Sequence, residues 1–307
     1  MPTYGMGDAI REMRNRLGCT QEELSYGICT AGTLSRIENG RAVVSKQVFE
    51  ALCSRMPGLH HVWVACDTKV EMLRSRLCKQ ILHELEFHRL REAKAAIDQY
   101  RIVKNDKNIF CRQFEGYTTA IYHAIAKEDE EYTLPMLKQA LSLTLPDYKE
   151  RLSGAKKSIM LTYDEIYIFI NMAIAYAKHQ DADAAFSIFY FLKRHMEKQG
   201  LETIEAMKTA PMIFGNLAWL LEKAGRFQEA VRQCENGIQI CHITGKYAIL
   251  PHLLCIKARC MAAVGNHRTA VKFRRQAESI LDVTEEYRGY GSFEELYKAR
   301  EPIYVTL

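Results

Sequence analysis

The sequence predicts an all-α protein in two parts, a cluster of short helices over residues 1–66 and an array of longer helix pairs over residues 67–307. Apolar residues recur at helical spacing through nearly the whole chain, whereas the alternating pattern of a strand is scarce. Residues 303–306 are the only strand-like stretch. Pro57 and Gly58 disfavour helix and mark the boundary between the two parts.

Composition indicates a soluble globular protein. Among 307 residues, 48% are hydrophobic and 26% are charged, which excludes global disorder. The net charge of +5 is compatible with nucleic acid without proving it. The longest apolar stretch, residues 166–177, is shorter than the ~20 residues of a membrane span. Ten cysteines, with neither an apolar secretory signal nor a C-x-x-C pair, indicate reduced, mostly buried thiols in the cytoplasm.

Capping residues place the first helices. We expect a helix over residues 8–16, followed by a second that begins after Thr20 and runs to about residue 25. Thr20 and Glu23 form a capping box, in which each side chain bonds the backbone N–H of the other residue. The apolar stripe of the first helix comprises Ile10, Met13 and Leu17.

A third helix follows a glycine-containing turn. Thr30 caps it, it runs to Glu38, and Asn39 and Gly40 end it. Ser45 caps a fourth helix. A short helix, a turn with glycine and a second short helix make the helix-turn-helix pattern, which places its second helix in the major groove of DNA.

The third helix has two contrasting faces at 100° per residue. Leu34 and Ile37 face one way, toward a core. The opposite face carries Ala31, Gly32, Ser35 and Arg36. Small residues allow close approach to a groove floor, and an arginine can reach a guanine edge or a phosphate. The alternative is an ordinary solvent-facing surface with no ligand.

The run LGCTQEEL at residues 17–24, with GICTAGTLSRIENGR at residues 27–41, resembles the XRE/lambda-repressor-like helix-turn-helix family. The match covers about one fifth of the chain. The resemblance implies binding to double-stranded DNA, with Gln21 and Asn39 at phosphates and Arg41 assisting at the backbone. The residues implied at or near the bases are Thr30, Ala31, Gly32, Ser35 and Arg36, and Thr33 belongs to the same DNA-binding set.

Domain charge argues for a dimer. Residues 1–70 carry eight Lys/Arg and seven Asp/Glu, a net charge of +1, which is weak for one DNA-binding domain. A homodimer on two half-sites doubles the contacts.

The second part contains an internal repeat of 40 residues. Its unit is an apolar helix, a turn and a second helix with alanine at the crossing point, and it resembles the tetratricopeptide repeat. The pairs that share the spacing are Pro211 and Pro251, Gly225 and Gly265, and Ala230 and Ala270. Further copies are expected over residues 74–100, 110–145 and 166–197, and a capping helix is expected from Ser292.

Stacked helix pairs form a solenoid with a concave groove. By resemblance, the first helix of each pair lines it, with Asn171 and Asn216 at equivalent positions. The donors and acceptor of an asparagine suit the backbone of an extended peptide, lysine or arginine can neutralise its carboxylates, and aromatic residues can anchor it. The expected peptide-binding set is Tyr167, Asn171, Lys178, Met212, Asn216, Trp219, Lys223 and Arg259. The alternative is that the asparagines bond neighbouring helices and Trp219 packs in the core.

No Walker loop, dinucleotide fingerprint or zinc-ligand spacing is present, so no enzyme, cofactor or metal is expected. The layout as a whole, an N-terminal helix-turn-helix domain followed by a tetratricopeptide-like α-solenoid, resembles the Rgg/PlcR-like (RRNPP) regulators. The resemblance implies a cytoplasmic, homodimeric quorum-sensing transcriptional regulator whose repeats bind a short signalling peptide (a pheromone) and thereby modulate DNA binding. One alternative is repeats that serve only dimerisation or partner docking. Another is a protein that sequesters a target or supports a phosphatase, against which the intact helix-turn-helix argues.

Overall fold

The structure, a computed structural model, describes residues 5–56, 68–127, 130–156, 159–198, 209–245, 247–284 and 290–304. In these ranges the regular elements are helices, with one short 3-10 helix, η1 (Tyr247–Ile249), and no strand. The expected all-α class is therefore confirmed. The domain boundary expected at residue 66 lies outside the described residues.

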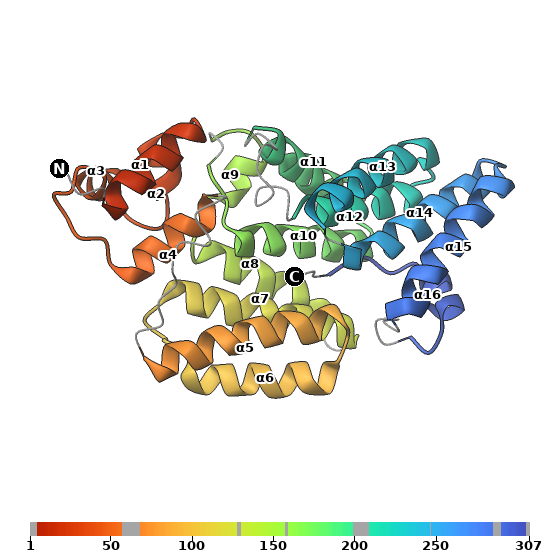
Figure 1. The fold of residues 1–307 in the computed structure, drawn as a ribbon, viewed down its shortest axis with the longest axis horizontal. Coiled ribbons are helices and arrows are strands. Elements are labelled where there is room, and N and C mark those ends of the chain that lie inside the picture. Colours follow the sequence, from red (N-terminus) through yellow and green to blue (C-terminus); the bar gives the residue numbers. More distant parts are fainter. Residues whose placement is uncertain are drawn as a thin grey trace.

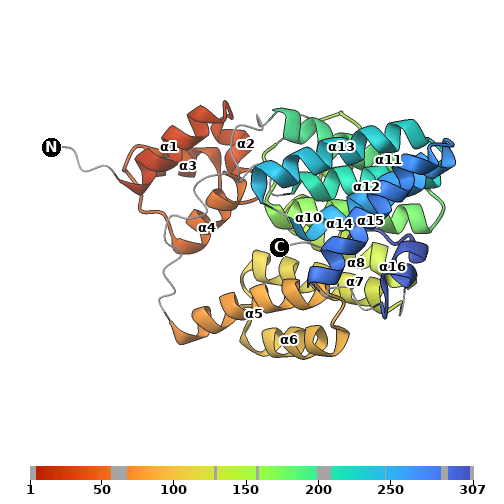
Figure 2. The same ribbon diagram turned by 45° about the vertical axis from the view of Figure 1, so that its right-hand side comes forward.

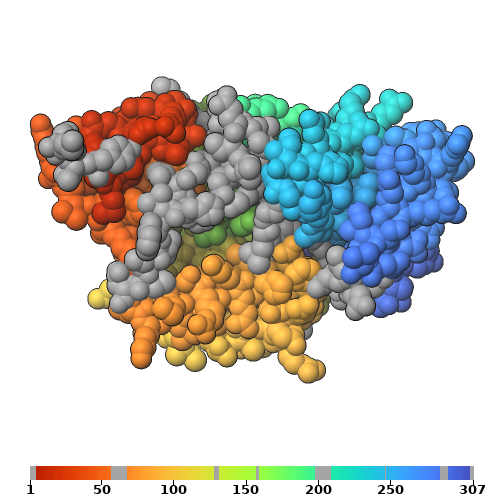
Figure 3. Space-filling view, in the orientation of Figure 1, coloured from red at the N-terminus to blue at the C-terminus, as the bar shows by residue number. Residues whose placement is uncertain are grey.

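The first four helices form a separate small bundle, which we call the head (Figure 1). They are α1 (Met6–Arg16), α2 (Gln21–Ser25), α3 (Ala31–Glu38) and α4 (Lys46–Arg55). Their apolar faces enclose a core of Ile10, Leu24, Leu34, Ile37, Leu52 and Met56, all nearly inaccessible to solvent. In the space-filling view the head forms one end of the elongated molecule (Figure 3).

The predicted caps of the head helices are present. The Thr20 hydroxyl accepts from the Glu23 N–H at 3.1 Å, and the Glu23 carboxylate accepts from the Thr20 N–H at 2.7 Å. Thr30 caps α3 by accepting from the Thr33 N–H at 3.1 Å, and Ser45 caps α4. These bonds satisfy amides that have no partner within a helix, so the boundaries follow from local chemistry.

The rest of the chain is a curved array of helical hairpins (Figure 1). The hairpins are α5 (Lys69–Glu86) with α6 (Leu90–Val103), α7 (Ile109–Ala126) with α8 (Glu130–Ser142), α10 (Tyr163–Lys178) with α11 (Ala182–Lys198), α12 (Ala210–Lys223) with α13 (Phe227–Thr244), and α14 (Leu250–Ala263) with α15 (His267–Thr284). Short helix α9 (Tyr148–Leu152) precedes α10, and α16 (Phe293–Ala299) follows the last hairpin. Beyond α16 the chain returns to the centre of the array (Figure 1).

Each hairpin turns on one residue in the left-handed conformation. Glycine takes this position twice, at Gly225 and Gly265, with φ of +73° and +82°. His88, Lys127 and Gln180 take it in the other turns, with φ near +60°. Side chains are rarely tolerated there, so only the two glycine turns give a strong repeat signal in the sequence.

The head rests on the array through a buried arginine. The Arg55 side chain is fully buried, donates to the Leu24 and Tyr26 carbonyls of the head, and lies 3.2 Å from a carboxylate oxygen of Glu165. Glu165, in the first turn of α10, also accepts from the Thr144 hydroxyl at 2.7 Å. Figure 2 shows α2 and α4 as the head helices nearest the array. Head and array are thus joined by an ion pair that water does not reach.

A backbone contact completes this joint. Gly27 lies in the turn between α2 and α3 with φ of +69°, and a Cβ atom placed on it would lie 2.3 Å from the Thr144 carbonyl oxygen. Beside it, the Arg151 guanidinium of α9 stacks on the Tyr26 ring at 4.3 Å and pairs with Asp147 at 2.9 Å. The sequence did not predict α9, which is only five residues long.

Candidate functional site

The outer face of α3 is open to solvent. Leu34 and Ile37 are buried, whereas Gly32 and Arg36 on the opposite side are exposed. A Cβ atom on Gly32 would meet nothing nearer than 4.0 Å. In both ribbon views α3 lies farther from the repeat array than α2 does (Figures 1 and 2). Within the described residues this face of α3 is therefore accessible to solvent.

The other predicted DNA-binding residues surround this face. Thr30, Asn39 and Arg41 are exposed, and Ala31, Thr33 and Ser35 are partly exposed. The Thr30 and Thr33 hydroxyls lie 2.9 Å apart, and the Asn39 amide donates to the Ser35 carbonyl at 2.8 Å.

Glu38, on the buried side of α3, ties this helix to α1 and α2. Its carboxylate accepts from the Arg14 guanidinium at 2.6 and 2.9 Å and from the Gln21 amide at 2.7 Å. Burial favours a raised pKa for Glu38, but the bonds from Arg14 and Gln21 outweigh it and lower the pKa. The Gln21 amide has a second hydrogen that this bond does not use.

The unpaired cations of the head gather at α3. In the described part of the chain Arg36 and Arg41 form no ion pair, and the Arg36 guanidinium donates to the Thr33 hydroxyl at 3.5 Å. The α1 arginines are paired with acids: Arg11 with Asp8, Arg14 with Glu38 and Arg16 with Glu12. A head of low net charge therefore still presents local positive charge on one face.

The predicted groove residues lie together on α10, α12 and α14. Asn171 and Asn216 are buried at 3% and 0% exposure, at equivalent places in successive hairpins. Each donates to the carbonyl four residues earlier, that of Tyr167 or Met212. Met212 is fully buried in the core, whereas Tyr167 is only partly buried.

Residues 300–304, which we call the return segment, fill this groove. The Asn216 amide donates to the Ile303 carbonyl, and its oxygen accepts from the Ile303 N–H, both at 2.8 Å. The Asn171 amide donates to the Tyr304 carbonyl at 2.9 Å. The Trp219 indole donates to the Arg300 carbonyl at 2.8 Å. The side chains expected to hold the backbone of a peptide thus bond the backbone of a non-helical stretch of the same chain.

The three predicted cations differ in their surroundings. The Lys178 ammonium lies 5.4 Å from the Tyr304 ring centre, and the Lys223 ammonium 4.9 Å from that of Trp219. Arg259 is nearly buried and forms a bidentate salt bridge with Glu222, with N–O distances of 2.6 and 2.7 Å. Because Glu222 cancels its charge, Arg259 adds little attraction for a carboxylate, in contrast to the sequence expectation.

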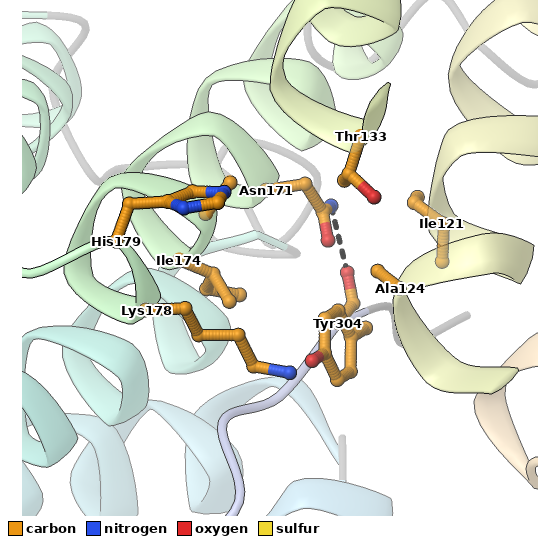
Figure 4. Close-up of a pocket in the computed structure, with 9 residues that line it drawn as sticks. Ile121, Ala124, Thr133, Asn171, Ile174, Lys178, His179 and Tyr304 are labelled. Carbon is orange, nitrogen blue, oxygen red and sulfur yellow. Dashed lines mark hydrogen bonds between the residues drawn. The ribbon is translucent and has the colours of Figure 1, made fainter. Parts of the chain in front are cut away.

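A small cavity of about 20 Å³ lies where the return segment meets α10. Figure 4 shows Asn171, Lys178 and Tyr304 facing one another across it, with the dashed bond from Asn171 to the Tyr304 carbonyl. The Asn171 side-chain oxygen accepts no hydrogen bond from the described residues. The cavity walls also include Ile121, Ala124, Thr133, Ile174 and His179.

The sequence missed the return segment as part of the site. Its only signal was the strand-like pattern of residues 303–306 in an otherwise helical chain.

Comparison with known proteins identifies the head. Residues 6–55 match the family model described as a helix-turn-helix domain, so the chain carries such a domain at these residues. No curated protein sequence matches the chain significantly.

The fold of nearly the whole chain is shared with a solved protein. The structure is similar to PlcR of Bacillus thuringiensis in complex with the peptide PapR7 and DNA, with a TM-score of 0.61 and 19% identity over 96% of this chain and 98% of that one. The apo form of PlcR gives a TM-score of 0.57 and 18% identity over 96% and 97% of the two chains. The order of the parts, a helix-turn-helix domain before a helical array, is therefore that of a known fold.

Two further features bear on the site. Among the described helices none has the length and apolar character needed to cross a membrane. In the same residues no group of three or more His, Cys, Asp or Glu side chains is arranged to hold a metal ion.

Proposed function

We propose that the protein is a cytoplasmic, homodimeric transcriptional regulator that binds double-stranded DNA through α3 and a short signalling peptide in its groove. The observation that carries the DNA-binding part is the open face of α3, with small residues at its start and two arginines that lack acidic partners. The shared fold with PlcR, solved with a peptide and DNA, supports both parts.

On DNA, α3 enters the major groove. Arg36 reaches a guanine edge, because a guanidinium matches its two acceptors. Gln21, Asn39 and Arg41 contact phosphates at the rim of the helix and set its register. The remaining residues at or near the bases are Thr30, Ala31, Gly32, Thr33 and Ser35.

In the groove, a peptide lies extended and is read through its backbone by Asn171 and Asn216. Trp219 and Tyr167 offer aromatic surface, and Lys178 and Lys223 supply positive charge for a carboxylate. The support for this role is that Asn171, Asn216 and Trp219 already bond backbone groups of the non-helical return segment.

Helix α10 links the two sites. Glu165 in its first turn pairs with Arg55 of the head, and Asn171 and Lys178 lie farther along the same helix. If α10 can adopt two placements and a peptide binds one of them more tightly, the peptide shifts the population toward that placement. Because α10 is joined to the head, the position of the head then changes as well.

The test begins with DNA selection from a random duplex library by the purified full chain. We expect an inverted repeat whose half-sites are spaced about one helical turn, ~10 base pairs, as a two-fold dimer requires. Light scattering then gives the mass of the complex. Failure to enrich any sequence, with a folded protein, contradicts the proposal.

The filled groove favours a second candidate for the array, in which the repeats serve only dimerisation or partner docking. Calorimetric titration with secreted-peptide libraries separates the two. Peptide binding that changes DNA affinity supports the first candidate, whereas DNA binding that no peptide alters supports the second.

A further inference from the structure

We propose that the return segment, residues 300–304, is an internal ligand of the groove, which an external peptide must displace. The proposal rests on the peptide-binding function above and deepens it by defining both the resting state of the site and the class of peptide that fits.

The backbone bonds support this role. Asn216 bonds both the N–H and the C=O of Ile303, as a neighbouring strand does for a residue in a sheet. Helices cannot offer such a ladder, because their own backbone groups are already paired, so side-chain amides take its place. The bonds from Asn171 and Trp219 extend the pairing to the Tyr304 and Arg300 carbonyls.

The side chains of the segment fill shaped positions. Ile303 is 1% exposed and sits over Gly215 of α12, where a Cβ atom would lie 2.8 Å from its terminal methyl group. Tyr304 is 4% exposed, with the Lys178 ammonium over its ring and the His88 ring edge-on at 6.4 Å. The groove therefore selects a branched aliphatic residue followed by an aromatic one.

The segment can leave without unwinding a helix. Helix α16 ends at Ala299, and Arg300 adopts φ of +52°, a conformation that arginine rarely takes. Pro302 has no N–H, so the segment has one fewer donor to satisfy. Its charged contact, Glu301 with Lys127 at 3.4 Å, involves a largely exposed lysine.

An external peptide can gain a contact at Asn171. Asn171 lines the small cavity, and the oxygen of its buried side chain accepts nothing from the described residues. A peptide that repeats the aliphatic–aromatic pair and directs one more N–H into the cavity pairs this oxygen. Such a peptide makes one bond more than the return segment does, and it displaces the segment once its concentration offsets the advantage that tethering gives the segment.

The test uses full-length chains and a labelled synthetic peptide with the sequence of residues 299–307, AREPIYVTL. Ile303→Asp places a charge in the apolar position over Gly215 and releases the segment. By fluorescence anisotropy, we expect this variant to bind the peptide at least about tenfold more tightly than the unchanged chain, since its groove is vacant.

The control is Lys298→Ala, an exposed side chain of α16 that does not touch the groove. It should bind the peptide as weakly as the unchanged chain, and adding Asn216→Ala to Ile303→Asp should abolish binding. Equal affinity of the unchanged chain and Ile303→Asp, or no binding by either, overturns the proposal. If either occurs while an external peptide still controls DNA binding, the proposed function stands.

Amide hydrogen exchange tests the same idea even where Ile303→Asp fails to fold. In the unchanged chain the Ile303 amide should be protected, and Asn216→Ala should speed its exchange at least about tenfold. Asn266→Ala, at the N-terminus of α15, is the matched control and should leave this amide protected. Exchange of Ile303 at the rate of a free peptide in the unchanged chain overturns the proposal.

Discussion

The outer face of α3 is open to solvent, whereas the groove along α10 and α12 is filled by the return segment. The difference follows from how each surface would meet its ligand. Arg36 and its neighbours remain hydrated when nothing is bound, so the open face carries no unsatisfied group. Asn171 and Asn216 are buried with the return segment in place, and its backbone supplies hydrogen-bond partners to both amides.

The largest effect is expected at the joint between head and array, which connects the two regions. Arg55→Met leaves the Glu165 carboxylate buried without its guanidinium, and we expect a loss of about 3–5 kcal/mol in the free energy of unfolding. Urea denaturation measures it. Arg16→Met, which breaks an exposed pair with Glu12, is the control and should cost under about 1 kcal/mol. Similar losses in the two variants would show that the joint is not fixed by Arg55.

The open face can be tested without disturbing the fold. Arg36→Ala should lower affinity for the selected DNA by about 100-fold, because each half-site loses a base contact of about 1–3 kcal/mol. The melting temperature should stay unchanged, since the guanidinium is exposed. Arg112→Ala, an exposed arginine of α7, removes the same charge from the array and should leave DNA affinity nearly unchanged. An Arg36→Ala protein that still footprints the same operator would refute the assigned role.

A substitution in the filled groove should change stability and the response to peptide, not the affinity for DNA. Asn216→Ala leaves the Ile303 N–H and C=O without their partner, and we expect it to lower stability by about 1–3 kcal/mol. It should also weaken the response to a signalling peptide about tenfold while leaving DNA affinity intact. Denaturation and anisotropy measure the two effects. A variant that loses DNA affinity and keeps its peptide response would reverse the assignment of the two regions.

The smallest effect is expected at the start of α10, in its pH dependence. Burial raises the pKa of Asp164 to about 6, although the Tyr117 hydroxyl donates to it at 2.9 Å. Because the folded chain holds this proton more tightly than the unfolded chain, the contribution of Asp164 to stability is complete below about pH 4 and is lost as the pH rises through 6.

Asp164→Asn should therefore stabilise the protein by about 1–2 kcal/mol at pH 7.5 and change little at pH 4. Urea midpoints at the two pH values give the comparison, with Asp98→Asn, at an exposed side chain of α6, as the control. A stabilisation of equal size at both pH values would assign the effect to something other than the charge of Asp164.

The sequence could predict features whose cause is local. Thr20 and Thr30 cap helices through bonds to residues three positions away, so their pattern is legible in the sequence. The positions of Asn171 and Asn216 followed from aligned repeats. The partner of Asn216 lies 87 residues farther along the chain, and no local pattern specifies such a contact. The burial of Arg55 against Glu165 was hidden for the same reason, as 110 residues separate them.

Gly27 brings the backbones of the head and the array into direct contact at the joint. It belongs to the turn that leads directly into α3, and it touches the Thr144 carbonyl backbone to backbone, with no room for a side chain between them. The Thr144 hydroxyl is itself held by Gln113 and Glu165. No side chain therefore separates the head from the array at this point, so Thr144 cannot move toward Gly27 unless the turn that leads into α3 moves as well.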